Sequence, residues 1–187
     1  MRPTRRHETG ANLVEFAIVL PIILLVVIGI LEVGMAFRDF LTVSNAAKEG
    51  VRVVAAMGDD PLSDCVVLTK TSSALASSVS LANLVTIQIF RANGDGDQIV
   101  DDTNTYTLPL GADPTDCTNW SPNPTEIDTL NWSPLVRRVK IGPLDDLDIA
   151  GVRVTYTHSW ITGFPPFIGS FVVDEATISR LEPEEYA

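Results

Sequence analysis

Residues 10–32 read GANLVEFAIVLPIILLVVIGILE, and this stretch decides the fold because it sets the compartment of all later residues. Between Ala11 and Leu31 the one ionisable side chain is that of Glu15. At a rise of about 1.5 Å per residue, this run forms a helix long enough to cross a hydrocarbon core about 30 Å thick. We therefore predict a transmembrane helix over residues 11–32.

Two residues of this helix are unusual for a simple anchor. Glu15 lies four residues inside the apolar run, where an ionised carboxylate costs about 3 kcal/mol or more unless it finds a partner or a hydrated site. Pro21 removes one backbone hydrogen bond in the middle of the helix. Both residues suggest a role beyond anchoring.

The charges around the span predict its orientation. Segment 1–10 is a basic leader that holds three arginines, Arg2, Arg5 and Arg6. Positive flanks stay cytoplasmic, so we expect a single-pass protein of the cell membrane with a cytoplasmic N-terminus and an extracytoplasmic C-terminal part. A cleaved signal peptide fits less well, because its apolar core spans only about 7 to 15 residues.

The exported part is strongly acidic. The first 32 residues hold three of the 24 acidic and three of the 13 basic residues, so the remainder carries a net charge of −11. Such a surface repels nucleic acid and anionic lipid head groups. We expect no nucleic-acid partner.

The helix is predicted to continue beyond the membrane as an amphipathic extension over residues 33–58. Its apolar stripe has helical spacing, whereas charged residues, Asp39 among them, are placed on the other faces. Gly58, followed by two aspartates and a proline, provides the end of the helix. The predicted stripe consists of Val33, Phe37, Phe40, Ser44, Ala47, Val51 and Val54.

Residues 59–187 are predicted to form an α+β head domain. A weaker helical pattern covers 62–82, and residues 85–90 and 99–108 alternate as the strands of a hairpin. Three more strands are predicted at 135–141, 151–161 and 170–181; in the second, Val152, Val154, Tyr156, His158 and Trp160 share one buried face. The predicted fold is pilin-like: a long N-terminal helix packed on an antiparallel sheet of four or five strands.

Between these strands, residues 111–134 are predicted to form a long loop. The loop contains two copies of Asn-Trp-Ser-Pro, at 119–122 and 131–134. We interpret both as turns that pack a tryptophan against the domain, with carbohydrate or partner binding as the alternative.

Cys65 and Cys117 are the only cysteines of the chain, and both fall in the exported part, where disulfides form. A bridge between them closes a loop of about 53 residues, worth roughly 4 kcal/mol in the chain-entropy model. Two buried free thiols are the alternative. No further ligands complete a zinc site.

Oxygen-bearing side chains in and just beyond the predicted hairpin turn form a weak calcium candidate: Asn93, Asp95, Asp97, Asp101 and Asp102. An EF-hand loop would require a glycine at Gln98 and a glutamate at Asn104, so a tight turn is the better interpretation. We predict neither a metal nor a cofactor.

No enzyme motif is present in the sequence. His158 lies on an apolar strand face, so a core histidine fits better than a catalytic one. The chain has no G-x-S-x-G and no phosphate-binding loop. We expect a protein that is not an enzyme.

An apolar turn, residues 164–168, separates the last two predicted strands. It either packs on the domain or contacts a neighbouring subunit or the membrane.

One set of residues runs through the span and its continuation: Gly10, LVEFA at 13–17, Val19-Leu20-Pro21, Gly29, Glu32, Gly34, Phe37, Asn45-Ala46-Ala47, Glu49-Gly50 and Arg52. Together with Arg180-Leu181-Glu182-Pro183 near the end of the chain, these residues resemble the TadE-like family, minor pilin-like proteins of tight-adherence (Flp-type) pilus systems. The resemblance covers residues 10–56 well and the exported domain only slightly.

The resemblance implies a role in pilus assembly. A prepilin peptidase cleaves between Gly10 and Ala11 in such proteins, which leaves Ala11 as a charged amino terminus. Glu15 then becomes the fifth mature residue and meets the amino group of an adjoining subunit. Phe16 belongs to the same assembly segment, and Pro21 lies where pilin helices are often kinked or loosened.

The implied function is that of a membrane-inserted minor pseudopilin of a tight-adherence pilus or a related secretion machine. Its implied partners are the membrane, other pilins and pseudopilins, the inner-membrane assembly platform and the prepilin peptidase. The alternative is a signal-anchored extracytoplasmic binding module that holds calcium, a glycan or a surface partner through its 93–102 or 111–134 loops.

Overall fold

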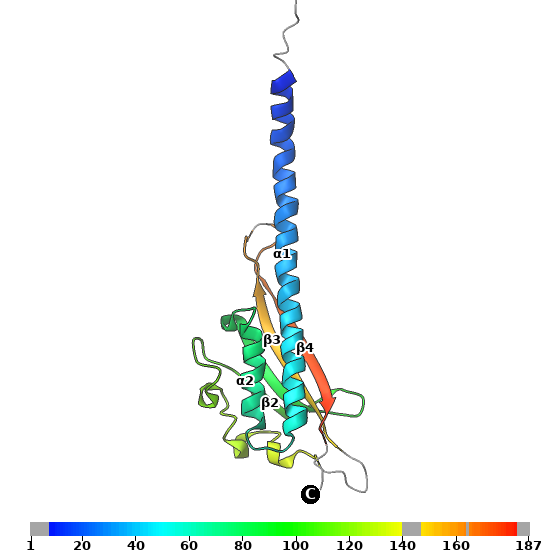
Figure 1. Ribbon diagram of the computed structural model, residues 1–187, viewed down its shortest axis with the longest axis vertical. Helices are drawn as coiled ribbons and strands as arrows, with labels where there is room; N and C mark the ends of the chain where they lie inside the picture. Colours follow the sequence, from blue (N-terminus) through cyan, green and yellow to red (C-terminus); the bar gives the residue numbers. More distant parts are fainter. Residues whose placement is uncertain (1–7, 140–146, 164, 183–187) are drawn as a thin grey trace, which may run out of the picture. The chain divides into compact units, whose positions relative to one another are not determined.

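The computed structural model describes residues 8–139, 147–163 and 165–182 (Figure 1). Its helices are α1 (Glu8–Met57) and α2 (Ser63–Ala76), and its strands are β1 (Leu84–Ala92), β2 (Gln98–Tyr106), β3 (Ile149–Ser159) and β4 (Ser170–Arg180). This composition confirms the predicted α+β class.

The chain divides into two compact units. Met1–Arg38 with Ser159–Gly169 form the first, which we call the apolar unit. Asp39–His158 with Ser170–Ala187 form the second, which we call the sheet domain.

Helix α1 is continuous through Pro21 and ends at Met57, as predicted. The next residue, Gly58, has a positive φ of 54°, and its N–H donates to the carbonyl oxygen of Val54 at 3.0 Å. A glycine adopts this left-handed conformation at little cost, which explains why the helix stops there.

The four strands form one antiparallel sheet in the order β2-β1-β3-β4. Strand β1 pairs with β2, with Ile87 opposite Tyr106, and with β3, with Ile89 opposite Val152. The predicted hairpin at 85–108 and the strands at 151–161 and 170–181 are therefore confirmed, although β3 ends before Trp160.

Within the sheet domain, α2 and the C-terminal part of α1 pack over one face of the sheet (Figure 1). At Gly50 an added Cβ would lie 2.5 Å from Thr71 Oγ1 and 3.0 Å from Val152 Cγ1, so only a glycine lets α1 approach both α2 and β3. The core between them includes Val43, Ala47, Val54, Leu68, Leu75, Ile87, Val152 and Val154.

The predicted apolar stripe of α1 is right in its second half and wrong in its first. Ala47, Val51 and Val54 are buried, whereas Val33, Phe37 and Phe40 are exposed. Two acidic residues, Glu32 and Asp39, are buried instead. Each accepts a hydrogen bond from a residue more than one hundred positions away. These distant donors offset the free-energy cost of burying a carboxylate, so the residues are buried although the local periodicity predicts exposure.

The predicted strand at 135–141 is also wrong. Pro134–Val136 is a short 3₁₀ turn, residues 137–139 have no regular structure, and residues 140 and 141 lie outside the described residues. The basic side chains are used for ion pairs: Arg137 bonds to Asp64, and Arg138 bonds to Asp148 through both its side chain and its backbone. The conformation of residues 137–139 therefore follows these ion pairs and not the pairing of a sheet strand.

A buried polar network links α2, β2 and the segment around Arg137. Asp64 receives hydrogen bonds from Arg137 Nη2, from Tyr106 Oη at 2.6 Å and from Asn104 Nδ2 at 3.0 Å. Burial next to the Asp64 carboxylate raises the pKa of Tyr106. The guanidinium of Arg137 also stacks on the Trp132 ring, 4.4 Å from its centre.

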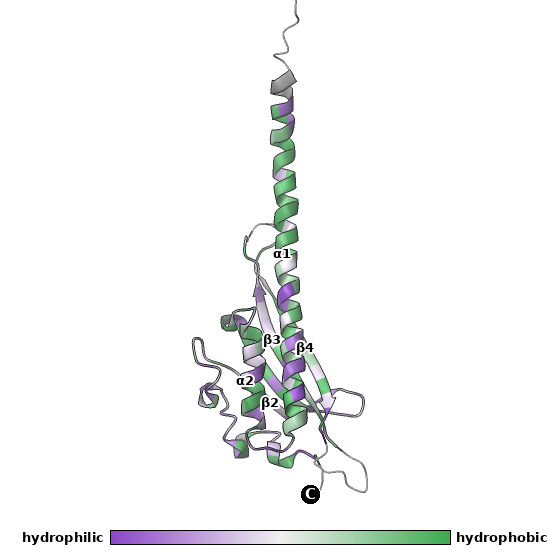
Figure 2. Ribbon diagram, viewed as in Figure 1, coloured by the Kyte–Doolittle hydropathy of each residue, from purple (hydrophilic) through white to green (hydrophobic). Residues whose placement is uncertain are grey.

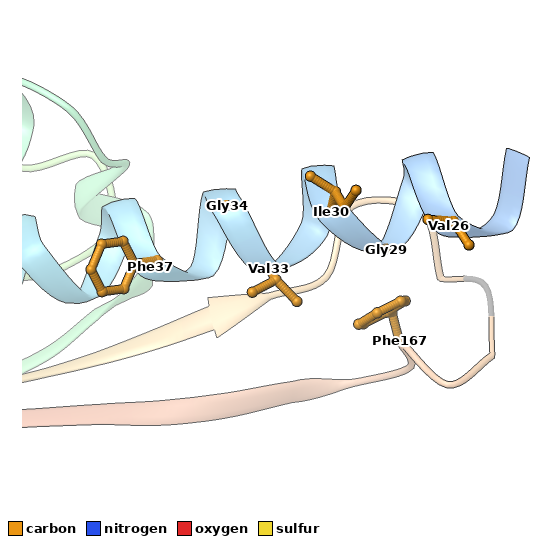
Figure 3. A pocket seen from close by; sticks show the side chains of 7 residues that line it. All are labelled: Val26, Gly29, Ile30, Val33, Gly34, Phe37 and Phe167. Atoms are coloured by element: carbon orange, nitrogen blue, oxygen red, sulfur yellow. The ribbon is translucent and has the colours of Figure 1, made fainter. Parts of the chain in front are cut away.

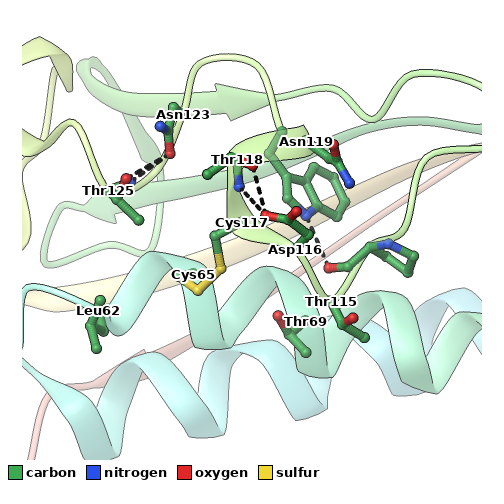
Figure 4. Close-up of a disulfide and its surroundings, with 12 residues drawn as sticks. Leu62, Cys65, Thr69, Thr115, Asp116, Cys117, Thr118, Asn119, Asn123 and Thr125 are labelled. Carbon is green, nitrogen blue, oxygen red and sulfur yellow. Dashed lines mark hydrogen bonds between the residues drawn. A yellow bond between two sulfur atoms is a disulfide. The ribbon is translucent and has the colours of Figure 1, made fainter.

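Residues 111–134 form the predicted long loop, which a disulfide between Cys65 of α2 and Cys117 holds against the domain (Figure 4). Both tryptophans of the repeated motif, Trp120 and Trp132, are buried, as expected for turns that pack them against the domain.

Polar side chains of this loop satisfy its own backbone. Asp113, Asp116 and Asn123 each accept, through Oδ1, the N–H and the hydroxyl of the threonine two residues later. Figure 4 shows these bonds for Asp116 and Asn123. Such local bonds are typical of Asx turns.

Candidate functional site

The N-terminal part of α1 presents a largely apolar surface (Figure 2). Every residue from Asn12 to Val27 is exposed. Since a helix turns about 100° per residue, exposure of more than two full turns means that the apolar surface extends around the whole helix. The surface therefore needs cover from outside the described chain.

By length and composition, α1 is one helix among the described residues that could cross a membrane. None of the residues in its most apolar window is buried. The core helix of a soluble protein would be mostly buried, so the lack of buried residues in this window distinguishes α1 from such a helix.

Glu15 interrupts this apolar surface. Its side chain is exposed, and within the described part of the chain it forms neither a hydrogen bond nor an ion pair. Asn12, Phe16 and Val19 lie beside it on the same helix face and line, with Glu15, a shallow depression of about 290 Å³. The structure thus brings Glu15 and Phe16 together.

Pro21 and Gly10 lie on other sides of the helix than Glu15. Pro21 is six residues beyond Glu15, about 240° around the helix. Gly10 and Ala11 lie in the first turns of α1, and Gly10 is exposed. A segment carrying Glu15 and Phe16 on one face and Gly10 near its start is the candidate functional site.

Residues 10–52 match the family model described as TadE-like protein. This match confirms the predicted resemblance. The TadE-like segment contains Gly10, Glu15, Phe16 and Pro21, and it relates the chain to tight-adherence pilus systems in general. No curated protein and no solved structure gives a significant match to the chain.

Sequence reasoning named Glu32 only among the residues of the resemblance and assigned it no contact. Glu32 is fully buried, and its carboxylate accepts the backbone N–H groups of Ile161 at 3.2 Å and Thr162 at 2.6 Å. Its spacing of seven residues from Asp39, the second buried acidic residue, was the available signal, because seven residues are close to two helical turns.

Asp39 is bonded within the sheet domain. Its Oδ2 lies 2.7 Å from Nδ1 of His158, and both side chains are buried. The predicted placement of His158 on the buried face of its strand is confirmed.

Of the weak calcium candidate, Asn93, Asp95 and Asp97 lie in the hairpin turn, and Asp101 and Asp102 lie in β2. Asn93 Oδ1 accepts the backbone N–H groups of Asp95 and Asp97, and Asp102 pairs with Arg91 at 3.1 Å. In the described residues, no group of three His, Cys, Asp or Glu side chains could hold a metal ion.

Proposed function

We propose that this protein is a membrane-inserted minor pseudopilin that takes part in assembling a tight-adherence (Flp-type) pilus. The observation that carries the proposal is Glu15, an exposed carboxylate without a partner among the described residues, inside the apolar surface of a TadE-like segment. A carboxylate within hydrocarbon needs an opposite charge or a hydrogen-bond donor. The described chain supplies neither, which supports a second protein as the partner of Glu15.

The chemistry of Glu15 fits an ammonium group as that partner. Asn12 and Phe16 flank the carboxylate, so an incoming group meets one polar and one aromatic side chain beside it. Cleavage between Gly10 and Ala11 creates an ammonium group at the start of each mature subunit, and the exposed Gly10 supports access for a prepilin peptidase. A neighbouring pilin can then neutralise Glu15.

The proposed orientation places the N-terminus in the cytoplasm and the sheet domain outside. The arginines of segment 1–10 support it through the positive-inside rule. The proposed partners are other pilins and pseudopilins, the inner-membrane assembly platform and the prepilin peptidase.

The proposed role is one of assembly and not of catalysis. The burial of His158 against Asp39 supports this, because neither group is accessible to a substrate. The polar side chains of the 93–102 and 111–134 loops bond to their own turns, which favours assembly over the alternative of a ligand-binding module.

The test is replacement of Glu15 by Ala in cells that carry the pilus system. Glu15→Ala should remain in the membrane fraction but abolish the incorporation of the protein into assembled pili or pilus-base complexes. Glu49→Ala is the matched control, since Glu49 is an exposed carboxylate of the same helix outside the apolar run. Assembly that is unchanged in Glu15→Ala would refute the proposed role of this carboxylate.

Processing is tested separately. N-terminal analysis of the membrane-purified protein should find Ala11 as the first residue. An intact Met1 in cells that hold the peptidase would contradict cleavage at Gly10.

A further inference from the structure

The segment that connects β3 to β4 is an apolar loop. Residues 159–169 read SWITGFPPFIG and carry no charged side chain. Ile161 and Ile168 are 69% and 64% exposed. An uncharged loop with large exposed aliphatic side chains is unfavourable in water, so its surroundings require an explanation.

Glu32 fixes this loop to α1. Its two carboxylate oxygens accept the consecutive N–H groups of Ile161 and Thr162. Because Glu32 is fully buried and both of these donors are backbone groups, the loop is held at a defined level of the helix. The loop also closes on itself, since Trp160 N–H donates to the carbonyl oxygen of Gly169 at 3.4 Å.

Phe167 shows where along α1 the loop is attached. Its ring lies against Gly29, where an added Cβ would be 3.5 Å from Phe167 Cε2. The ring of Trp160 packs on Phe167, with centres 5.1 Å apart. Gly29 lies within the apolar run, three residues before Glu32, so Phe167 shares the depth of the last apolar turn.

An apolar groove runs along α1 beside Phe167 (Figure 3). Its volume is about 550 Å³. Its walls are formed by Val26, Gly29, Ile30, Val33, Gly34, Phe37 and Phe167, none of which carries a charge or a side-chain hydrogen-bonding group.

We propose that the 160–169 loop inserts into the bilayer leaflet around residues 26–37 of α1, with a lipid acyl chain in this groove. Three observations carry the proposal: the uncharged loop, its attachment at the depth of Gly29, and the purely apolar groove. A tryptophan next to the apolar run also fits the membrane interface, where this residue is enriched.

Lipid, and not a second copy of the chain, is the occupant that the exposure favours. The helix before the groove is exposed on all faces, and both loop isoleucines are exposed as well. A single neighbouring helix would cover one side of this surface, whereas hydrocarbon surrounds all of it. The inference rests on the membrane insertion contained in the proposed function.

Nitroxide labels on the full-length protein in phosphatidylcholine nanodiscs test the proposal. The native cysteines are joined in a disulfide, so each single-cysteine variant carries one reactive thiol. Ile168→Cys probes the loop, Leu24→Cys serves as the membrane reference, and Val100→Cys is the matched control, because Val100 is an exposed aliphatic residue of the sheet domain.

At residue 168 the ratio of oxygen to nickel collision rates should approach that at residue 24 without reaching it, because Gly29 lies nearer the end of the apolar run than Leu24. It should exceed that at residue 100 by about tenfold or more, because the charged nickel complex is excluded from hydrocarbon. A ratio at 168 like that at 100, with residue 24 protected, would overturn the loop inference alone. Nickel access at residue 24 would instead show that membrane insertion itself fails.

Two further readouts address the groove and its occupant. Lipids with brominated acyl chains should quench part of the tryptophan fluorescence of the wild type. This quenching should be absent in Trp160→Phe, because Trp120 and Trp132 are buried in the sheet domain. Equal quenching in both proteins would count against the proposal. Spin–spin broadening at residue 168 that disappears on dilution with unlabelled protein would assign the loop to a second copy and overturn the lipid assignment.

Discussion

Val54 in the sheet domain and Val27 in the apolar unit lie on the same helix, yet Val54 is fully buried and Val27 is 46% exposed. The sheet domain contains its own cover for α1, namely α2 and β3. In the apolar unit, the described chain offers only the 160–169 loop. Hydrophobicity alone therefore does not tell which part of a helix belongs to a protein core.

Glu15 of the apolar unit differs from the buried carboxylates of both units, since Glu32 of its own unit accepts two backbone N–H groups. In the sheet domain, Asp39 bonds to His158 and Asp64 bonds to Arg137, Tyr106 and Asn104. Glu15 in the apolar unit has no partner among the described residues. A carboxylate that is satisfied inside the chain stabilises the fold, whereas one without an internal partner is available for assembly.

The largest effect is expected from breaking the buried ion pair of the sheet domain. Arg137→Met should lower the free energy of unfolding by about 3 to 5 kcal/mol, because it leaves Asp64 buried with an uncompensated charge. Denaturant unfolding of the full chain in detergent micelles, followed by tryptophan fluorescence, measures this change. Asp64→Leu combined with Arg137→Met should recover part of the loss; a double variant as unstable as the sum of the singles would contradict the argument.

Removal of the disulfide should affect only one of the two units, because both cysteines belong to the sheet domain. Cys65→Ala with Cys117→Ala should destabilise that domain by about 2 to 4 kcal/mol through the longer unrestrained loop in the unfolded chain. Membrane partitioning should not change, since the apolar unit contains neither cysteine. Loss of the protein from the membrane fraction would show that the units are not independent in this respect.

The two valines test the comparison directly. Val54→Ala should cost about 2 kcal/mol of stability through the cavity it leaves. Val27→Ala should change it by less than about 0.5 kcal/mol, because no packed neighbours are lost. Both are measured by denaturant unfolding in micelles. Equal effects of the two substitutions would contradict the claim that Val54 is packed in the protein core and Val27 is not.

The smallest effect is a dependence on pH. Burial beside Asp64 raises the pKa of Tyr106 above its ordinary value, so the folded state keeps the phenol protonated after the unfolded state ionises. This stabilisation is complete below about pH 10 and declines as the pH rises further, by about 1.4 kcal/mol at pH 11. Unfolding measured at pH 8 and pH 11 should show this loss in the wild type and not in Tyr106→Phe; the same loss in both would contradict it.

Elements with a clear period were predictable from the sequence. The long helix, its end at Gly58 and the β1–β2 hairpin follow from apolar spacing and turn residues, which are local signals. The candidate site was equally accessible, because an isolated carboxylate such as Glu15 is visible in an apolar run.

Features that depend on distant partners were not predictable. The burial of Asp39 requires His158, and the absence of a strand around Arg137 requires Asp64. For residues 164–168 the sequence predicts an apolar turn with its contacts left open, because the attachment of the loop depends on Glu32 and Gly29. No local pattern contains these partners.

By itself, the sequence determined that this chain has an apolar helix with one acidic residue near its start and an acidic α+β domain after it, because periodicity and charge are properties of neighbouring residues. Only the tertiary structure decided which face of the helix is buried and which carboxylates are satisfied within the chain. The physical reason is that a buried polar group is stable only when a specific donor reaches it, and folding alone brings such donors from far along the sequence.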